Sequence, residues 1–100
     1  MLQFDTLKIA KRSECSVTYV IAKVNVQNPA EPVMYWEVTP GWGGRFQSDV
    51  GRAKAYKTPG IAKSVIKTGA YIQHDISDAK IRGYEICVMK VTSVCTTEVV

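Results

Sequence analysis

The feature that most constrains the fold is the β-forming run of residues 15–26, CSVTYVIAKVNV, in which Lys23 is the single charged residue. Alternate side chains of a strand point to opposite faces, and both sets are largely apolar in this run. Such a strand is covered on both sides, so we expect it at the centre of a sheet. Residues 84–94 have the same character and are a second candidate for the sheet centre.

Three shorter strands are predicted beside these two. Residues 2–10 alternate apolar and polar side chains with one slip, 33–38 resume after two prolines, and 51–56 alternate basic with small or aromatic residues. The polar residues 11–14 are interpreted as a turn. The segment 39–46 holds three glycines and one proline and is interpreted as a loop.

One helix is predicted, over residues 59–68. Thr58 supplies an N-cap hydroxyl, and Pro59 occupies the first helical position, where a missing N–H costs nothing. Gly69 is placed to end the helix in a left-handed conformation. The face turned toward the sheet consists of Ile61, Ala62, Val65 and Ile66. Residues 70–82 fit neither period and are interpreted as irregular, and one helical turn after Asp75 or Ser77 stays open.

These elements predict an α+β fold. It has a mostly antiparallel sheet of about five strands, with the 59–68 helix packed on one face through Ile61, Val65 and Ile66. A doubly wound α/β fold would need several crossover helices. The 100 residues form a single domain, 1–100, large enough for one core.

Composition places the chain among globular proteins, with 46% hydrophobic and 22% charged residues. No window approaches the ~20 apolar residues that cross a bilayer. The N-terminus has neither a basic nor an apolar signal region, so we expect a cytoplasmic protein that binds no membrane.

The three cysteines, Cys15, Cys87 and Cys95, form an odd set without CxxC spacing. Cys87 and Cys95 lie too far apart on one extended strand to bond to each other. We interpret all three as buried reduced thiols, and a bridge from Cys15 to a neighbouring strand stays open.

The positive charge is concentrated in one segment. Residues 1–44 balance to zero, whereas residues 45–67 hold six basic side chains against Asp49 alone. The aromatic residues Tyr35, Trp36, Trp42 and Phe46 adjoin this segment; we expect Trp36 in the core and leave Trp42 open. The candidate partner-binding residues are Trp42, Arg45, Phe46, Arg52, Lys54, Tyr56, Lys57, Lys63 and Lys67.

Basic and aromatic side chains together suit an acidic protein surface or a nucleic acid. Charge alone does not separate these partners. A solvated basic face that binds nothing is the third interpretation. Strong β runs also leave open a homodimer formed through a sheet edge.

Enzymatic chemistry finds little support. His74 is the only histidine and has no cysteine at a zinc-site spacing, and residues 41–44 do not form a GxGxxG phosphate loop. We expect no cofactor, no metal and no catalytic residue. The alternative is a small enzyme with its site near the glycine-rich loop and His74.

Residues 51–66, GRAKAYKTPGIAKSVI, resemble a pattern of small accessory proteins of tailed bacteriophages. In that pattern a basic, tyrosine-bearing strand leads through a threonine cap into a short helix. The resemblance covers sixteen residues and implies a compact β-rich protein that often binds and disables a host protein. It carries over no functional residue. The sequence thus predicts a non-enzymatic binding protein, with a nucleic-acid-binding module as the alternative, acting in the host cytoplasm if it is encoded by a phage.

Overall fold

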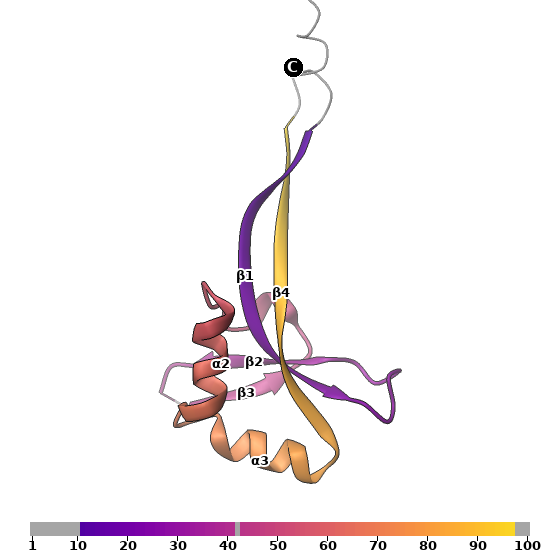
Figure 1. Cartoon of the computed structure of the whole chain (residues 1–100), viewed down its shortest axis with the longest axis vertical. Coiled ribbons are helices and arrows are strands. Elements are labelled where there is room, and N and C mark those ends of the chain that lie inside the picture. The colour runs from indigo at the N-terminus through magenta and orange to yellow at the C-terminus, as the bar shows by residue number, and fades with distance from the viewer. Residues whose placement is uncertain (1–10, 42, 98–100) are drawn as a thin grey trace, which may run out of the picture.

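The computed structural model describes residues 11–41 and 43–97, and it is an α+β fold (Figure 1). A four-stranded antiparallel sheet has the order β3-β2-β1-β4. The strands are β1 (Lys11–Asn25), β2 (Met34–Thr39), β3 (Gly43–Gln47) and β4 (Tyr84–Thr97). The helices are the short 3-10 helix η1 (Val50–Arg52), α2 (Pro59–Thr68) and α3 (Gln73–Ile81). The predicted class is confirmed, although about five strands and one helix were expected.

The central position predicted for residues 15–26 is confirmed, because β1 lies between β2 and β4. The turn predicted at residues 11–14 is wrong. These residues extend β1 and pair with the last residues of β4. A strand that runs outside the core does not need an apolar face, so polar residues do not end it. The second candidate for the sheet centre, residues 84–94, is the edge strand β4. The strand predicted at 2–10 lies outside the described residues.

The loop predicted at residues 39–46 is largely a β-hairpin, since β3 begins at Gly43. Gly41 and Gly43 have φ of 82° and 88°, the left-handed backbone that the turn requires. Gly44 is required for a different reason, which is the space available to its side chain. A Cβ added there would lie 2.5 Å from Cζ2 of Trp36, so only glycine lets the Trp36 ring pack against β3. The glycines thus serve the hairpin rather than an open loop.

The bounds predicted for the helix at 59–68 are confirmed. Thr58 Oγ1 accepts the Ile61 N–H at 3.2 Å, and Pro59 occupies the first turn. The left-handed end predicted at Gly69 is wrong, because Gly69 has φ −61° and ψ 130°. Its role is spatial: a Cβ there would lie 2.6 Å from the carbonyl oxygen of Val65.

The buried face of α2 differs from the predicted one by a rotation of the helix. Ala62 is fully buried, and Val65 and Ile66 pack against the core. Ile61, predicted to face the sheet, is 48% exposed. The small Ala62 side chain allows the helix backbone to approach β1, which turns its neighbour Ile61 outward.

The irregular segment predicted at 70–82 contains α3. Of its side chains only Ile76 and Ala79 are buried, together with Ile72 at the N-cap. These three residues are spaced four and three apart, as on one face of a helix. Three buried residues among polar neighbours, however, give only a weak helical pattern in the sequence. The Gln73 side chain donates to the Ile66 carbonyl at 2.8 Å and ties α3 to α2. No helix in the described ranges is long and apolar enough to cross a membrane.

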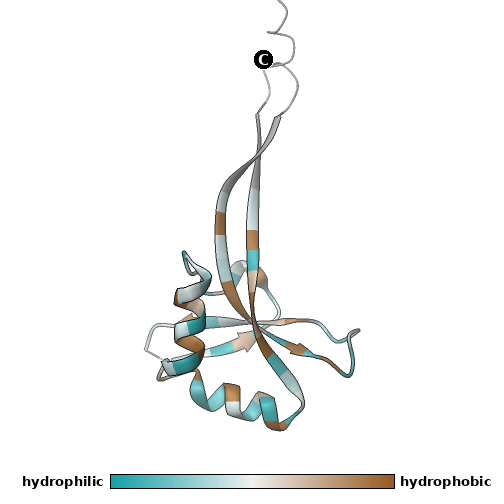
Figure 2. Cartoon of the chain, viewed as in Figure 1, coloured by the Kyte–Doolittle hydropathy of each residue, from teal (hydrophilic) through white to brown (hydrophobic). Residues whose placement is uncertain are grey.

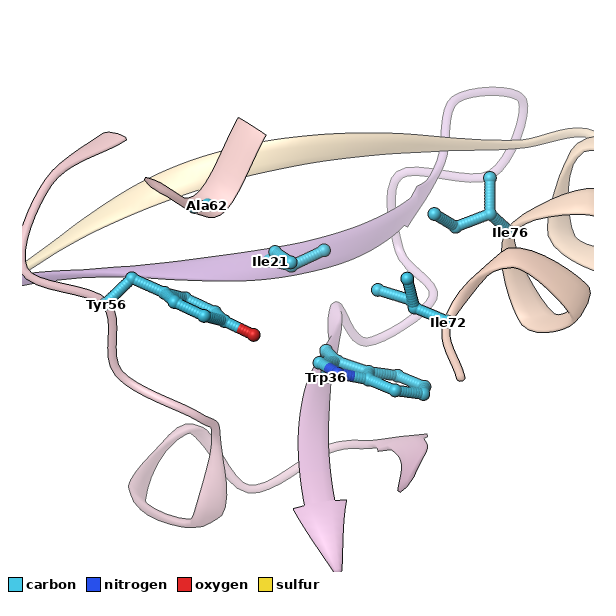
Figure 3. Packing of buried hydrophobic residues seen from close by; sticks show 6 residues of the cluster. All are labelled: Ile21, Trp36, Tyr56, Ala62, Ile72 and Ile76. Carbon is cyan, nitrogen blue, oxygen red and sulfur yellow. The ribbon is translucent and has the colours of Figure 1, made fainter. Parts of the chain in front are cut away.

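The core lies between the sheet and the two helices. Its members are Ile21, Trp36, Tyr56, Ala62, Ile72 and Ile76 (Figure 3). Trp36 is 2% exposed, which confirms its predicted place in the core.

Residues 51–56, predicted as a strand, close a gap in the sheet instead. The chain passes through η1, and then the Lys54 N–H donates to the Trp36 carbonyl at 2.8 Å. Tyr56 exchanges two backbone hydrogen bonds of 2.8 Å with Tyr19. The segment thus fills the space where β1 and β2 diverge, since these strands pair only at Ala22↔Tyr35 and Lys23↔Met34.

β1 and β4 continue beyond the rest of the sheet as a two-stranded ribbon (Figure 1). We use "the ribbon" for residues 11–18 of β1 and 91–97 of β4, which pair from Thr18↔Val91 to Lys11↔Thr97 with a bulge between Glu14 and Ser16. The radius of gyration is 18.1 Å, against about 13 Å for a compact chain of this length. The protein is therefore a small packed body with a projecting ribbon.

Candidate functional site

The predicted basic residues divide between two faces of the sheet. Trp36 points toward α2 and α3, so Glu37, next along β2, points to the opposite face. Arg45 lies opposite Glu37 on β3, and Arg52 ends η1 on the same face. Lys63 and Lys67 are exposed on α2, which packs on the Trp36 side. A single surface holding all the basic residues is not formed.

The structure instead brings two arginines to one carboxylate. Arg45 Nε lies 3.3 Å from Glu37 Oε1, and Arg52 Nη2 lies 3.5 Å from Glu37 Oε2. The Glu37 side chain is 14% exposed, whereas those of Arg45 and Arg52 are 60% and 57% exposed. One largely enclosed negative charge therefore holds two guanidinium groups at the surface, with one positive charge in excess.

Local hydrogen bonds fix the turn that carries Arg52. Asp49 caps η1, its side chain accepting the Gly51 N–H at 2.9 Å. The Gln47 side chain accepts the Asp49 N–H at 2.6 Å and donates to the Asp49 carbonyl at 2.8 Å. Because Gln47 ends β3, these bonds fasten η1 to the same hairpin that carries Arg45.

A surface hollow of about 380 Å³ adjoins the two arginines. It is lined by Glu37, Thr39, Gly44, Arg45 and Arg52. A guanidinium has five N–H donors, so its contact with Glu37 leaves donors for a further anion. Planar guanidinium groups bind carboxylate and phosphate oxygens in pairs. The arrangement, which we call the Glu37 arginine pair, is suited to an anionic group on a partner.

Two predicted contact residues serve the core instead. Tyr56 is 9% exposed and belongs to the core cluster, and burial raises the pKa of its hydroxyl. The Phe46 ring packs on Trp36 with a centroid distance of 5.3 Å, and Lys23 Nζ lies 5.1 Å from its centre. Lys54 and Lys57 are exposed. Trp42 lies outside the described residues.

Sequence reasoning missed Glu37, which organises the site. A hairpin between residues 34–39 and 43–47 would have indicated its role. When residue 36 pairs with residue 46, Glu37 lies opposite Arg45. Interpreting 39–46 as a loop concealed that pairing.

The enzymatic alternative named the glycine-rich loop and His74. A second hollow, about 550 Å³, adjoins the glycine turn and is lined by Val38, Thr39, Pro40, Gly41, Gly43 and Tyr71. His74 is exposed on α3 and is not among its lining residues. Residues 11–41 and 43–97 hold no group of three metal-ligating side chains.

Cys87 is a half-buried free thiol on β4. Burial, and secondarily the charge of Glu85, raise the pKa of the Cys87 thiol, so the neutral form is favoured. The side chains of Cys15 and Cys95 lie outside the described ones.

Comparison with protein families, curated proteins and solved structures finds no significant match to the chain.

Proposed function

We propose that the protein is a non-enzymatic binding protein that docks an acidic protein segment at the Glu37 arginine pair. The observation that carries the proposal is the sharing of one carboxylate by two arginines that are each more than half exposed. Arginine is favoured over lysine where carboxylates are bound in fixed geometry.

The distribution of charge favours an acidic protein over a nucleic acid. A nucleic-acid surface needs a continuous basic track that follows the phosphates. Here Arg45 and Arg52 lie on one face, and Lys63 and Lys67 lie on the helix layer over the other. Two arginines beside a hollow match one or two carboxylates better than a phosphate backbone.

The resemblance of residues 51–66 to phage accessory proteins supports a host protein as the partner. Within that segment, the threonine cap and the helix are present, whereas residues 51–56 are not a regular strand. The cytoplasm of a bacterial host is the compartment that this proposal implies.

The binding experiment uses defined probes of opposite chemical class. The full chain is titrated with a fluorescent polyglutamate peptide and with single-stranded and duplex DNA, over a range of salt. We expect the peptide to bind and the double variant Arg45→Ala/Arg52→Ala to lose at least about tenfold in affinity, which equals about 1.4 kcal/mol.

The matched control removes the same charge elsewhere. Lys63→Ala/Lys67→Ala also lowers the net charge by two, but on α2, and should leave peptide affinity nearly unchanged. Equal losses in both double variants would show that net charge alone binds the peptide. Tighter binding of duplex DNA, with log affinity falling at a slope near −0.9 per phosphate contact, would favour the nucleic-acid alternative.

A further inference from the structure

The outer edge of β4 is a long strand edge that no other strand of the described residues pairs with. β4 ends the sheet order, with β1 on its other side. Among residues 11–41 and 43–97, no backbone hydrogen bond reaches this edge from a turn, loop or cap. An edge of this kind presents unpaired N–H and C=O groups to another strand.

The ladder shows which groups point outward. The N–H and C=O of Tyr19 both bond to Tyr56, so they point away from β4. Tyr19 lies opposite Lys90, which makes this a non-hydrogen-bonded pair in the β1–β4 ladder. The N–H and C=O of Lys90 therefore also point outward. By alternation, those of Thr92, Val94 and Thr96 do the same.

The other strand edges carry features that discourage pairing. β3 has five residues and includes Arg45. The outer edge of β1 in the ribbon includes Lys11, Arg12 and Glu14 and is interrupted by the bulge after Glu14. Charges, bulges and short length all protect edges. The ribbon part of β4, residues 91–97, has no charged residue and pairs in unbroken sequence order along its length.

We infer that residues 91–97 pair with the same residues of a second copy, antiparallel about a twofold axis. Such an edge is complementary to itself, because each outward-facing residue presents both a donor and an acceptor. Each chain carries a net charge of +4, and this uncharged stretch lets two copies meet without opposing like charges.

Pairing of two copies through β4 would also stabilise the ribbon, which is exposed to solvent. A two-stranded ribbon is marginally stable in water by itself, and three or more strands are needed for independent stability. Two ribbons joined at β4 form a four-stranded antiparallel sheet. This interface goes beyond the proposed binding function and uses none of the residues of the Glu37 arginine pair.

The test measures molar mass by light scattering after size exclusion. We expect the full chain to have twice its mass of 11.1 kDa. Thr92→Pro removes an outward N–H while sparing the ladder to β1, because proline is tolerated at outward edge positions. This variant should have the mass of one chain. Thr92→Val keeps the N–H and should retain the doubled mass.

Two further measurements keep the test decisive. If Thr92→Pro fails to fold, Thr92→Lys keeps the N–H but places a charge on the edge, and it should give the single mass. In the dimer the amides of Thr92, Val94 and Thr96 should exchange slowly with solvent, and dilution should abolish that protection. A single-chain mass for the wild type, a doubled mass for Thr92→Pro, or protection that dilution does not change would overturn the interface. The last result would indicate that another part of the same chain covers the edge.

Discussion

At the scale of single residues, small side chains decide how closely the elements of this protein approach one another. Gly44 lies against the Trp36 ring and Gly69 against the Val65 carbonyl, and Ala62 is the fully buried residue of α2. Within residues 11–41 and 43–97, only Gly41, Gly43 and Gly83 have positive φ. At Gly44 and Gly69 a side chain is excluded by neighbouring atoms and not by backbone conformation.

Gly44→Ala should therefore destabilise the protein. The added Cβ would lie 2.5 Å from Trp36 Cζ2 and 2.6 Å from the Glu37 carbonyl oxygen, so β2 and β3 must move apart. We expect a loss of about 1–3 kcal/mol in the free energy of unfolding, as for an overpacked core, measured by urea denaturation.

Gly60→Ala is the matched control for that measurement. Its added Cβ would meet nothing nearer than 3.9 Å, and Gly60 is helical. Alanine is favoured over glycine in helices, so the free energy of unfolding should rise by up to about 0.5–1 kcal/mol. Equal effects of the two substitutions would contradict the packing described for Gly44.

Tyr56 should make folding sensitive to alkaline pH. Burial raises the pKa of its hydroxyl above the ordinary value of 10.0, so the unfolded chain releases this proton first. The protonated Tyr56 hydroxyl therefore contributes stability that is fully present below pH 10 and is lost as pH rises through the folded-state pKa. Unfolding curves of wild type and Tyr56→Phe between pH 8 and about 11 should diverge, with the wild type losing more stability. Parallel curves would place the hydroxyl in contact with solvent.

Glu37 should oppose the proposed binding, because its carboxylate occupies arginine N–H donors that a partner could use. Glu37→Gln leaves two arginine charges without a counterion, so the affinity for polyglutamate should increase and depend more steeply on salt. The cost in stability should stay below about 1 kcal/mol, since both arginines are more than half exposed. Fluorescence anisotropy at two salt concentrations measures the affinity. A weaker complex would mean that Glu37 is needed to position the arginines and that this positioning outweighs the charge.

At the scale of elements, α2 has one face that tolerates change and one that does not. Ile61→Ala should lower the free energy of unfolding by less than about 1 kcal/mol, because its side chain is 48% exposed. Ala62→Leu should cost about 1–3 kcal/mol, because no space remains beneath it. Chemical denaturation of the two variants distinguishes the observed face from the predicted one. A larger loss for Ile61→Ala would restore the predicted face.

Elements with local signals could be predicted from the sequence, and elements that depend on distant partners could not. The Thr58-Pro59 cap specifies the start of α2 through one hydrogen bond to Ile61, which is a local interaction. The helix α3 has no side-chain cap, and three buried residues hold it in place. Its existence depends on packing that the segment itself does not encode.

The candidate site divides in the same way. Arg45 and Arg52 were predicted from a local excess of charge, and both contact Glu37 in the Glu37 arginine pair. Their common partner Glu37 comes from a preceding strand, and only the hairpin register brings it near. Tyr56 carried the same signal of a basic, aromatic strand, but its pairing with Tyr19 places it in the core.

At the scale of the whole molecule, hydropathy follows the division into body and ribbon. Hydrophilic and hydrophobic residues alternate along the helices, while the coloured part of the ribbon is pale or hydrophobic (Figure 2). Val17, Thr18 and Val91 are partly buried there, and Ser16, Thr92 and Ser93 are exposed. The ribbon thus presents small and β-branched residues, whereas one face of the body presents arginines. The ribbon is suited to pairing with another strand, and the arginine-bearing face is suited to an acidic partner.

The pairing of β1 with β4 also constrains the order in which the protein folds. Lys11 pairs with Thr97 and Asn25 with Tyr84, so every other described element lies between the paired residues. Contacts so distant in sequence form slowly. During synthesis the central strand must wait, with one side unpaired, until β4 has emerged from the ribosome. Until then the nascent chain exposes the apolar residues 17–22, and at that stage chaperones have the most opportunity to bind it.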